Sequence, residues 1–200
     1  MWLLEDACVI CDAPANGVCD ACVQQLVAAD VPPLLSIEGA TALFSYEGVG
    51  SELLQALKYK NRRSALGPLV DALAQSLSPD VDAIVAVPGN PARVRERGVD
   101  IPAVMARRLS RRLDVPTAKP ILRVDEGSQT HRDRFERLSI EFRSVCSSPS
   151  RVLLVDDVVT TGATAVACAD ALRVAGASVI SFTALAATPV PELTRQDGKP

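Results

Sequence analysis

The segment Val152-Leu-Leu-Val-Asp-Asp-Val-Val-Thr-Thr-Gly-Ala-Thr164 decides how this chain of 200 residues folds. Its four apolar residues, Val152 to Val155, predict a buried strand, and two aspartates follow them directly. A helix is expected next, over 163–175, with Gly176 as its cap. A strand, a turn and a helix in this order predict a parallel α/β unit. The two acids should therefore lie at the carboxyl end of a strand, where open α/β sheets bind ligands.

The turn between this strand and helix has the composition of an anion-binding site. Free N–H groups in the first turn of a helix point toward an anion, and the helix dipole favours negative charge there. Gly162 lets the backbone approach the anion closely, and the three threonines can donate hydroxyl hydrogen bonds. A phosphate monoester held here would place a sugar beside Asp156 and Asp157, whose carboxylates can accept hydrogen bonds from ribose hydroxyls. The predicted phosphate loop comprises Val158, Val159, Thr160, Thr161, Gly162, Ala163 and Thr164.

Two plainer interpretations of the same segment remain open. Apolar strands that end in two aspartates also occur in phosphoacceptor domains, and Thr-Gly before a helix can serve capping alone. A nucleotide-binding P-loop is excluded because no Gly-Lys-Ser/Thr follows, and a dinucleotide fingerprint is excluded because the segment has a single glycine.

The rest of the chain alternates between strand-like and helix-like patterns. Strands are expected over 41–46, 82–88, 118–124 and 178–186, and helices over 51–59, 65–77 and 101–113. This alternation predicts an α/β domain over 40–190, with a parallel sheet flanked by helices. The polar, arginine-rich stretch 125–150 is expected to be a loop or hood, and 191–200 a flexible tail.

The segment 152–164 resembles the thirteen-residue signature of type I phosphoribosyltransferases, which use it to bind phosphoribosyl pyrophosphate (PRPP). The resemblance implies that Asp156 and Asp157 contact the ribose hydroxyls and take part in catalysis. It also implies that residues 160–164 bind the 5′-phosphate. Magnesium is implied as Mg²⁺ bound to the diphosphate, without a dedicated set of protein ligands.

Arginines are concentrated between Gly89 and Arg112, where seven arginines face two acids for a local net charge of +5, although the whole chain carries −3. The first three lie in a turn-rich segment after the strand over 82–88, a position that suits a pyrophosphate loop. Guanidinium groups bind phosphate oxygens in a fork geometry. The proposed pyrophosphate contacts are Arg93, Arg95 and Arg97. The other four lie opposite an apolar helical stripe, which also indicates a solvated helix face: Arg107, Arg108, Arg111 and Arg112.

Four cysteines are gathered near the start of the chain, in two Cys-x2-Cys pairs: Cys8, Cys11, Cys19 and Cys22. Four thiolates paired in this way have the number and spacing of a closed, structural Zn²⁺ site. A small module over 1–35 would need such a metal to be stable. The alternatives are four reduced cysteines packed in a small core and a degenerate site that no longer binds metal.

The cysteine module, the Lys58-Tyr59 pair and the run Val87 to Gly98 together resemble ComF-type competence proteins, a branch of the phosphoribosyltransferase-like superfamily. The chain departs from that pattern at Val99-Asp100-Ile101, where Phe-Asn-Gln is frequent. Gln129 and Arg137 match the branch's following loop, whereas Ile140 replaces its usual asparagine.

The resemblance implies a glycosyltransferase that binds PRPP or a nucleoside monophosphate and transfers the phosphoribosyl group to a nitrogen acceptor. It also implies a role in competence, with DNA or a DNA-uptake or recombination protein as partner. The alternative is a non-catalytic nucleotide- or DNA-associated binding module on the same fold. Because charges or prolines interrupt every apolar run and the first residues lack a basic flank, no membrane span and a cytoplasmic location are expected.

Overall fold

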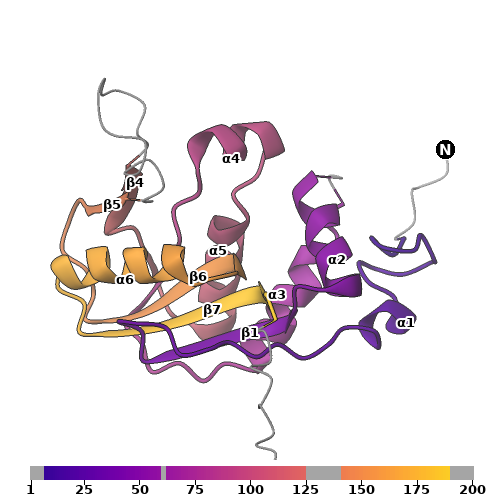
Figure 1. The fold of residues 1–200 in the computed structure, drawn as a ribbon, viewed down its shortest axis with the longest axis horizontal. Coiled ribbons are helices and arrows are strands. Elements are labelled where there is room, and N and C mark those ends of the chain that lie inside the picture. The colour runs from indigo at the N-terminus through magenta and orange to yellow at the C-terminus, as the bar shows by residue number, and fades with distance from the viewer. Residues whose placement is uncertain (1–6, 60–61, 125–140, 190–200) are drawn as a thin grey trace, which may run out of the picture.

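The computed structural model describes residues 7–59, 62–124 and 141–189, and its centre is a parallel sheet (Figure 1). Across this sheet the strands follow the order β1-β7-β6-β2-β3, and every neighbouring pair is parallel. The expected α/β architecture is therefore confirmed. The strands are β1 (Gly39–Ser45), β2 (Ala83–Ala86), β3 (Thr117–Ala118), β6 (Arg151–Val159) and β7 (Val179–Ala187).

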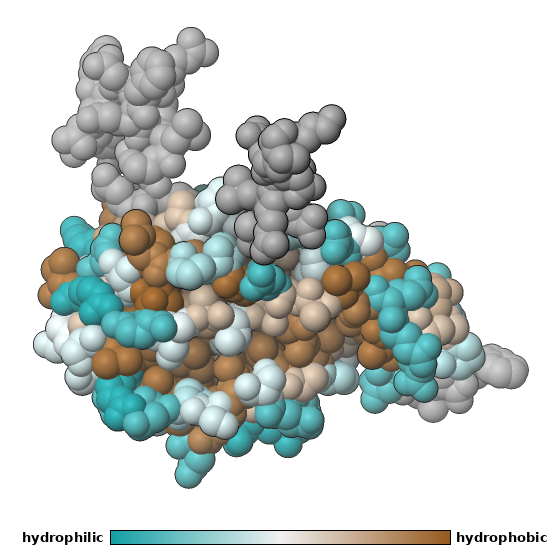
Figure 2. Space-filling view, turned by 60° about the horizontal axis from the view of Figure 1, so that its bottom comes forward, coloured by the Kyte–Doolittle hydropathy of each residue, from teal (hydrophilic) through white to brown (hydrophobic). Residues whose placement is uncertain are grey.

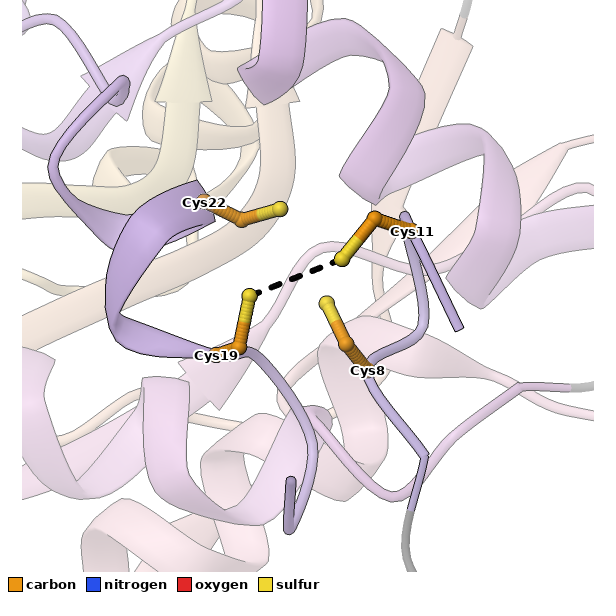
Figure 3. Close-up of side chains that lie close together, drawn as sticks. All are labelled: Cys8, Cys11, Cys19 and Cys22. Carbon is orange, nitrogen blue, oxygen red and sulfur yellow. Dashed lines mark hydrogen bonds between the residues drawn. The ribbon is translucent and has the colours of Figure 1, made fainter. Parts of the chain in front are cut away.

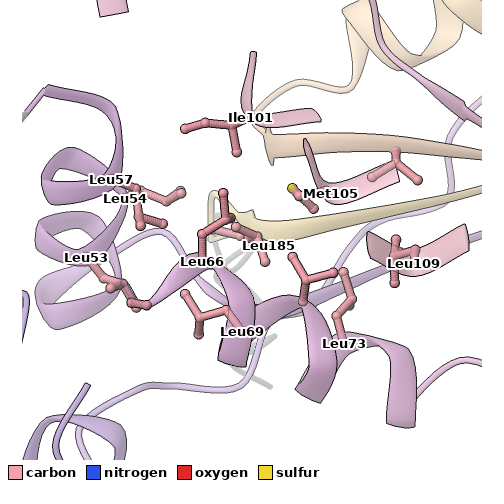
Figure 4. Packing of buried hydrophobic residues seen from close by; sticks show 14 of the residues in the cluster. Leu53, Leu54, Leu57, Leu66, Leu69, Leu73, Ile101, Met105, Leu109 and Leu185 are labelled. Atoms are coloured by element: carbon pink, nitrogen blue, oxygen red, sulfur yellow. The ribbon is translucent and has the colours of Figure 1, made fainter. Parts of the chain in front are cut away.

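Helices cover both faces of the sheet, which explains the continuous apolar run in β6. Successive side chains of a strand point to opposite faces. Accordingly Leu153 and Val155 pack in one core cluster, and Val152 and Leu154 in the other. Figure 4 shows the first cluster, where leucines of three helices pack with Met105 and Leu185. The first face carries α2 (Gly48–Tyr59), α3 (Leu66–Gln75) and α5 (Ile101–Leu113), and the second carries α6 (Ala163–Val174).

The strand expected over 118–124 is instead two short strands. β3 ends at Ala118 in the main sheet, and β4 (Ile121–Val124) pairs with the antiparallel β5 (Glu141–Ser144) beside α6. Pro120 lies between them, and proline both lacks an N–H for the ladder and restricts the residue before it. The prediction of a loop over 125–150 is wrong for β5. Residues 125–140, with Gln129, Arg137 and Ile140, lie outside the described residues, as does the predicted tail.

The strand β6 runs to Val159, four residues beyond its expected end at Val155. Its pairing with β2 stops at Val155, whereas its pairing with β7 continues to Val159. The chain leaves β2 toward β3 on one side and leaves β6 toward β7 on the other. Asp156 and Asp157 thus follow the last β2–β6 pair at the point where the strand order reverses, which is where open α/β sheets form a ligand crevice.

The arginine-rich segment after β2 is a helix, α4 (Pro91–Arg97), and the prediction of a turn-rich loop is wrong there. The Asn90 side chain accepts hydrogen bonds from the N–H groups of Ala92 and Arg93 at 3.0 and 3.1 Å. Gly98, with φ 66°, ends the helix. An asparagine cap, a proline in the first turn and a closing glycine are ordinary helix signals. As a consequence, Arg93 and Arg97 lie one turn apart on the same side of α4.

The segment that follows the cysteines runs back beside β1 and, at Leu34, reaches Gly162 in the predicted phosphate loop. The Val27 carbonyl accepts a hydrogen bond from the N–H of Ser45, at 2.8 Å. A cavity of about 450 Å³, lined mainly by apolar side chains, lies where this segment meets β1 and α3. The face drawn in Figure 2 carries hydrophobic side chains across its middle and hydrophilic ones along its margins.

Only glycine fits at position 162, because of its backbone conformation and because Leu34 lies close to it. Its φ is 78°, in the left-handed region, and a Cβ built on it would lie 2.3 Å from Leu34 Cδ2. Leu34 is buried in the same cluster as Val159 and Ala165. The bend from β6 into α6 therefore depends on a glycine that lets an apolar side chain press against the loop.

Replacing Gly162 with alanine should lower the free energy of unfolding by about 2 kcal/mol or more, because left-handed strain and steric overlap with Leu34 add together. Urea denaturation would measure the loss. Gly176→Ala is the matched control, since Gly176 has φ 108° but no atom within 4 Å of its Cβ position. Equal losses in the two variants would contradict the role assigned to Leu34.

Candidate functional site

One acid and most of the predicted phosphate loop line a single recess at the carboxyl end of β6. The recess has a volume of about 30 Å³. Thr161 does not line it and instead accepts a hydrogen bond from the N–H of Ala163, at 3.4 Å, through its hydroxyl. The lining residues are Asp156, Val158, Val159, Thr160, Gly162, Ala163 and Thr164, together with Ala165 and Phe182.

Asp156 supplies the carboxyl group of this recess. Burial raises its pKa to about 8, and the neighbouring charge of Asp157 acts in the same direction. Its Oδ1 also accepts a hydrogen bond from the N–H of Asp157, at 2.8 Å. Below pH 8 the group is therefore mainly a neutral acid, which can donate one hydrogen bond as well as accept others.

Asp157 does not line the recess. Its Oδ2 lies 2.9 Å from Lys58 Nζ, and each of these side chains is only 11% exposed. Lys58 belongs to α2, on the opposite face of the sheet from α6. Adjacent residues of a strand point to opposite faces, so the two acids have different surroundings. The sequence drew attention to Lys58 only as part of a family pattern, and no local signal linked it to Asp157.

The arginines of α4 have distinct surroundings. The Arg97 guanidinium stacks on the Tyr59 ring, 5.0 Å from its centre, and donates a hydrogen bond to the phenol oxygen at 2.8 Å. Arg63 in turn donates to the Arg97 carbonyl at 2.5 Å. The Nε groups of Arg63 and Arg97 are buried without an acceptor among the described residues. Arg93 and Arg95 are exposed.

The four later arginines divide into two pairs. Arg108 and Arg112 both bind Asp71 of α3, and these hydrogen bonds hold the pKa of its carboxyl well below the usual range. Arg107 and Arg111 lie exposed on α5. The first pair ties α5 to α3, and the second belongs to a solvated helix face.

The four cysteines form one cluster (Figure 3). Their Sγ atoms all lie within 4.8 Å of one another, and Cys11 and Cys19 are 3.6 Å apart. With Zn–S bonds of about 2.3 Å, tetrahedral sulfurs would be roughly 3.8 Å apart. The cluster thus has the number and spacing of ligands that a structural zinc ion requires.

The thiols of this cluster have unequal acidity. Burial raises the pKa of Cys8, but hydrogen bonds from the N–H groups of Cys11, Cys19 and Ile10 outweigh it and bring the pKa to about 6. Burial and the three neighbouring thiols raise the pKa of Cys22. The Cys8 thiol is therefore more acidic than the Cys22 thiol.

Comparisons with protein-family models and with curated proteins find no match for this chain. Among solved structures, it is similar to glutamine PRPP amidotransferase from B. subtilis, with 20% identity and a TM-score of 0.45 over 60% of this chain and 26% of that one. It is similar to a purine phosphoribosyltransferase from Pyrococcus horikoshii, with 27% identity and a TM-score of 0.40 over 63% of this chain and 76% of that one. It is also similar to adenine phosphoribosyltransferase from Saccharomyces cerevisiae, with 14% identity and a TM-score of 0.43 over 66% of this chain and 74% of that one.

The chain thus spans about a quarter of the amidotransferase and about three quarters of the other two proteins. Within the described ranges, no helix has the length and apolarity needed to cross a membrane.

Changing Asp156 to asparagine should stabilise the protein, and more so at high pH. The folded-state pKa of about 8 lies above the unfolded value of roughly 4, so the folded state holds an extra proton between these values. Its stabilising effect is complete below pH 4 and is lost as the pH rises through 8. Asp156→Asn should thus raise the free energy of unfolding at both pH values, and at pH 8 by at least about 1 kcal/mol more than at pH 5. Urea denaturation at the two pH values measures this difference. The exposed Asp170→Asn is the control, and equal gains at both pH values would contradict the argument.

Proposed function

We propose that this chain binds PRPP or a nucleoside monophosphate at the carboxyl end of β6. One observation carries the proposal: Asp156 and all but Thr161 of the predicted phosphate loop from Val158 to Thr164 line one recess, at the point where the strand order reverses. The helix α6 begins within this loop, at Ala163, and helix starts favour phosphate groups. An acid beside a phosphate seat matches the hydroxyls of a ribose 5-phosphate.

The proposed roles follow from position and charge. The loop residues Thr160 to Thr164 hold the 5′-phosphate, and Asp156 binds a ribose hydroxyl. Asp157, the next residue, faces the other side of the sheet and pairs with Lys58. The ammonium group of Lys58 thus places a positive charge near the proposed sugar site. Arg93, Arg95 and Arg97 of α4 are proposed to bind the diphosphate, which would bring its own Mg²⁺.

The reaction is proposed from the resemblance to type I phosphoribosyltransferases. A nitrogen nucleophile would attack C1 of the ribose and form a C–N bond, while the C–O bond to the diphosphate breaks and the diphosphate leaves with its electron pair. The arginines would stabilise the charge that develops on the leaving group. By its resemblance to ComF-type proteins, the chain is proposed to act in competence and DNA uptake in the cytoplasm. The second candidate is a module of the same family that binds PRPP without turnover.

Calorimetric titration of the full chain with PRPP and Mg²⁺ should show binding, and Asp156→Asn should weaken it at least about tenfold, because the acid O–H that can donate to a ribose hydroxyl is lost. Asp170→Asn, which removes an exposed acid from α6, should bind like the wild type. Release of diphosphate in the presence of a panel of bases separates the enzyme from the binding module. Absence of any binding by the wild type would overturn the proposed function.

We propose further that the four cysteines hold one structural zinc ion, since all four sulfurs are used and no position is open for a substrate. Elemental analysis of reduced protein should find about one zinc per chain, and Cys19→Ala should reduce this occupancy. Cys146→Ala, at an exposed cysteine outside the cluster, is the control. Zinc binding should weaken as the pH falls from 8 to 6, because protons compete for the thiolates. Less than half an equivalent of zinc at pH 8 would contradict the proposal.

A further inference from the structure

The cysteine module is joined to the α/β domain at one of its own metal-ligand residues. Arg62 donates a hydrogen bond to the carbonyl of Cys8, at 2.9 Å, and forms an ion pair with Asp12 at 2.5 Å. Val9, next to Cys8, is buried in the core cluster that includes Leu53. A zinc ion that fixes the Cys8 sulfur would therefore also fix the carbonyl group that Arg62 binds.

Arg63, the residue after Arg62, contacts α4. Arg63 binds the carbonyl of Arg97, the last residue of α4, at 2.5 Å. Arg97 is itself held by Tyr59, through both its stacked guanidinium and the hydrogen bond of 2.8 Å. The position of the cysteine module is thus connected to the helix proposed to bind diphosphate.

The same set of contacts ends at Asp157, the residue next to Asp156 in β6. Tyr59 follows Lys58 at the end of α2, and Lys58 forms the buried ion pair with Asp157. A continuous series of contacts therefore connects Cys8, a proposed zinc ligand, with Asp157 of β6. Each step is a hydrogen bond, an ion pair, a ring contact or a peptide bond between neighbouring residues.

We propose that metal binding at the four cysteines and ligand binding at the β6 crevice strengthen each other through Arg62 and Arg63, which act as positioning residues. This inference rests on the proposed function of the crevice. If α4 and Asp157, the neighbour of Asp156, are already ordered, ligand binding costs less conformational entropy, so the metal would raise the affinity for the ligand. Coupling between two binding sites is reciprocal, so the ligand must hold the metal more tightly in return.

The test uses the zinc-loaded full chain and measures how fast zinc passes to a chromogenic chelator. Saturating PRPP with Mg²⁺ should slow this release about tenfold in the wild type. Arg62→Ala should abolish the effect of the ligand, and Arg62→Lys should restore part of it because the ammonium can still reach Asp12. Arg111→Ala, which removes an exposed arginine from α5, should behave like the wild type.

Calorimetric titration of the same zinc-loaded proteins distinguishes failure of the proposed function from failure of the coupling alone. Absence of PRPP binding by the wild type would overturn the proposed function of the crevice. Binding that leaves the zinc release rate unchanged would overturn the coupling alone, and so would a ligand effect of wild-type size in Arg62→Ala. Zinc content measured before each run keeps a variant that merely fails to load metal from being counted as uncoupled.

Discussion

The continuation of β6 past its neighbour β2 is the constraint on which the rest of the site depends. From Asp156 to Val159 the strand keeps its backbone bonds with β7 alone. This places two adjacent carboxyl groups where the sheet begins to open, yet still largely away from water. Burying a charge is unfavourable unless it is neutralised or paired, and the fold meets this demand twice in consecutive residues.

The two solutions differ because the two side chains face different layers. Asp156 faces the recess beside α6 and remains mainly protonated at neutral pH, whereas Asp157 faces α2 and is paired with Lys58. A neutral acid and a neutralised carboxylate are chemically distinct partners for a sugar. An acid whose burial opposes stability, retained in a recess beside a phosphate-type loop, is typical of a functional site.

The need to neutralise Asp157 also draws other elements together. The end of α2 must reach β6 to bring Lys58 into place, and this brings Tyr59 beside α4. Arg62 and Arg63 then lie between the cysteine module and α4. The cysteine module thus contacts the α/β domain through residues close in sequence to Lys58, the partner of Asp157.

Much of this structure is predictable because its signals are local. The apolar run of β6, the stripe that predicted a helix over 101–113 and the paired cysteines each depend on residues close together in sequence, and all appear as expected. The helix α4 and the break at Pro120 were also encoded locally, by Asn90-Pro91 with Gly98 and by proline itself, although the overall composition pointed to a loop and a single strand.

The sequence by itself determined the parallel α/β class, the turn from β6 into α6 and the cluster of four cysteines. Only the tertiary structure decided that Asp156 and Asp157 face different layers, that Lys58 neutralises one of them and that Leu34 presses on Gly162. The physical reason is distance along the chain. Local patterns set the periodicity of strands and helices, but the partner of a buried charge or of a bare glycine is whichever segment the packed chain brings there.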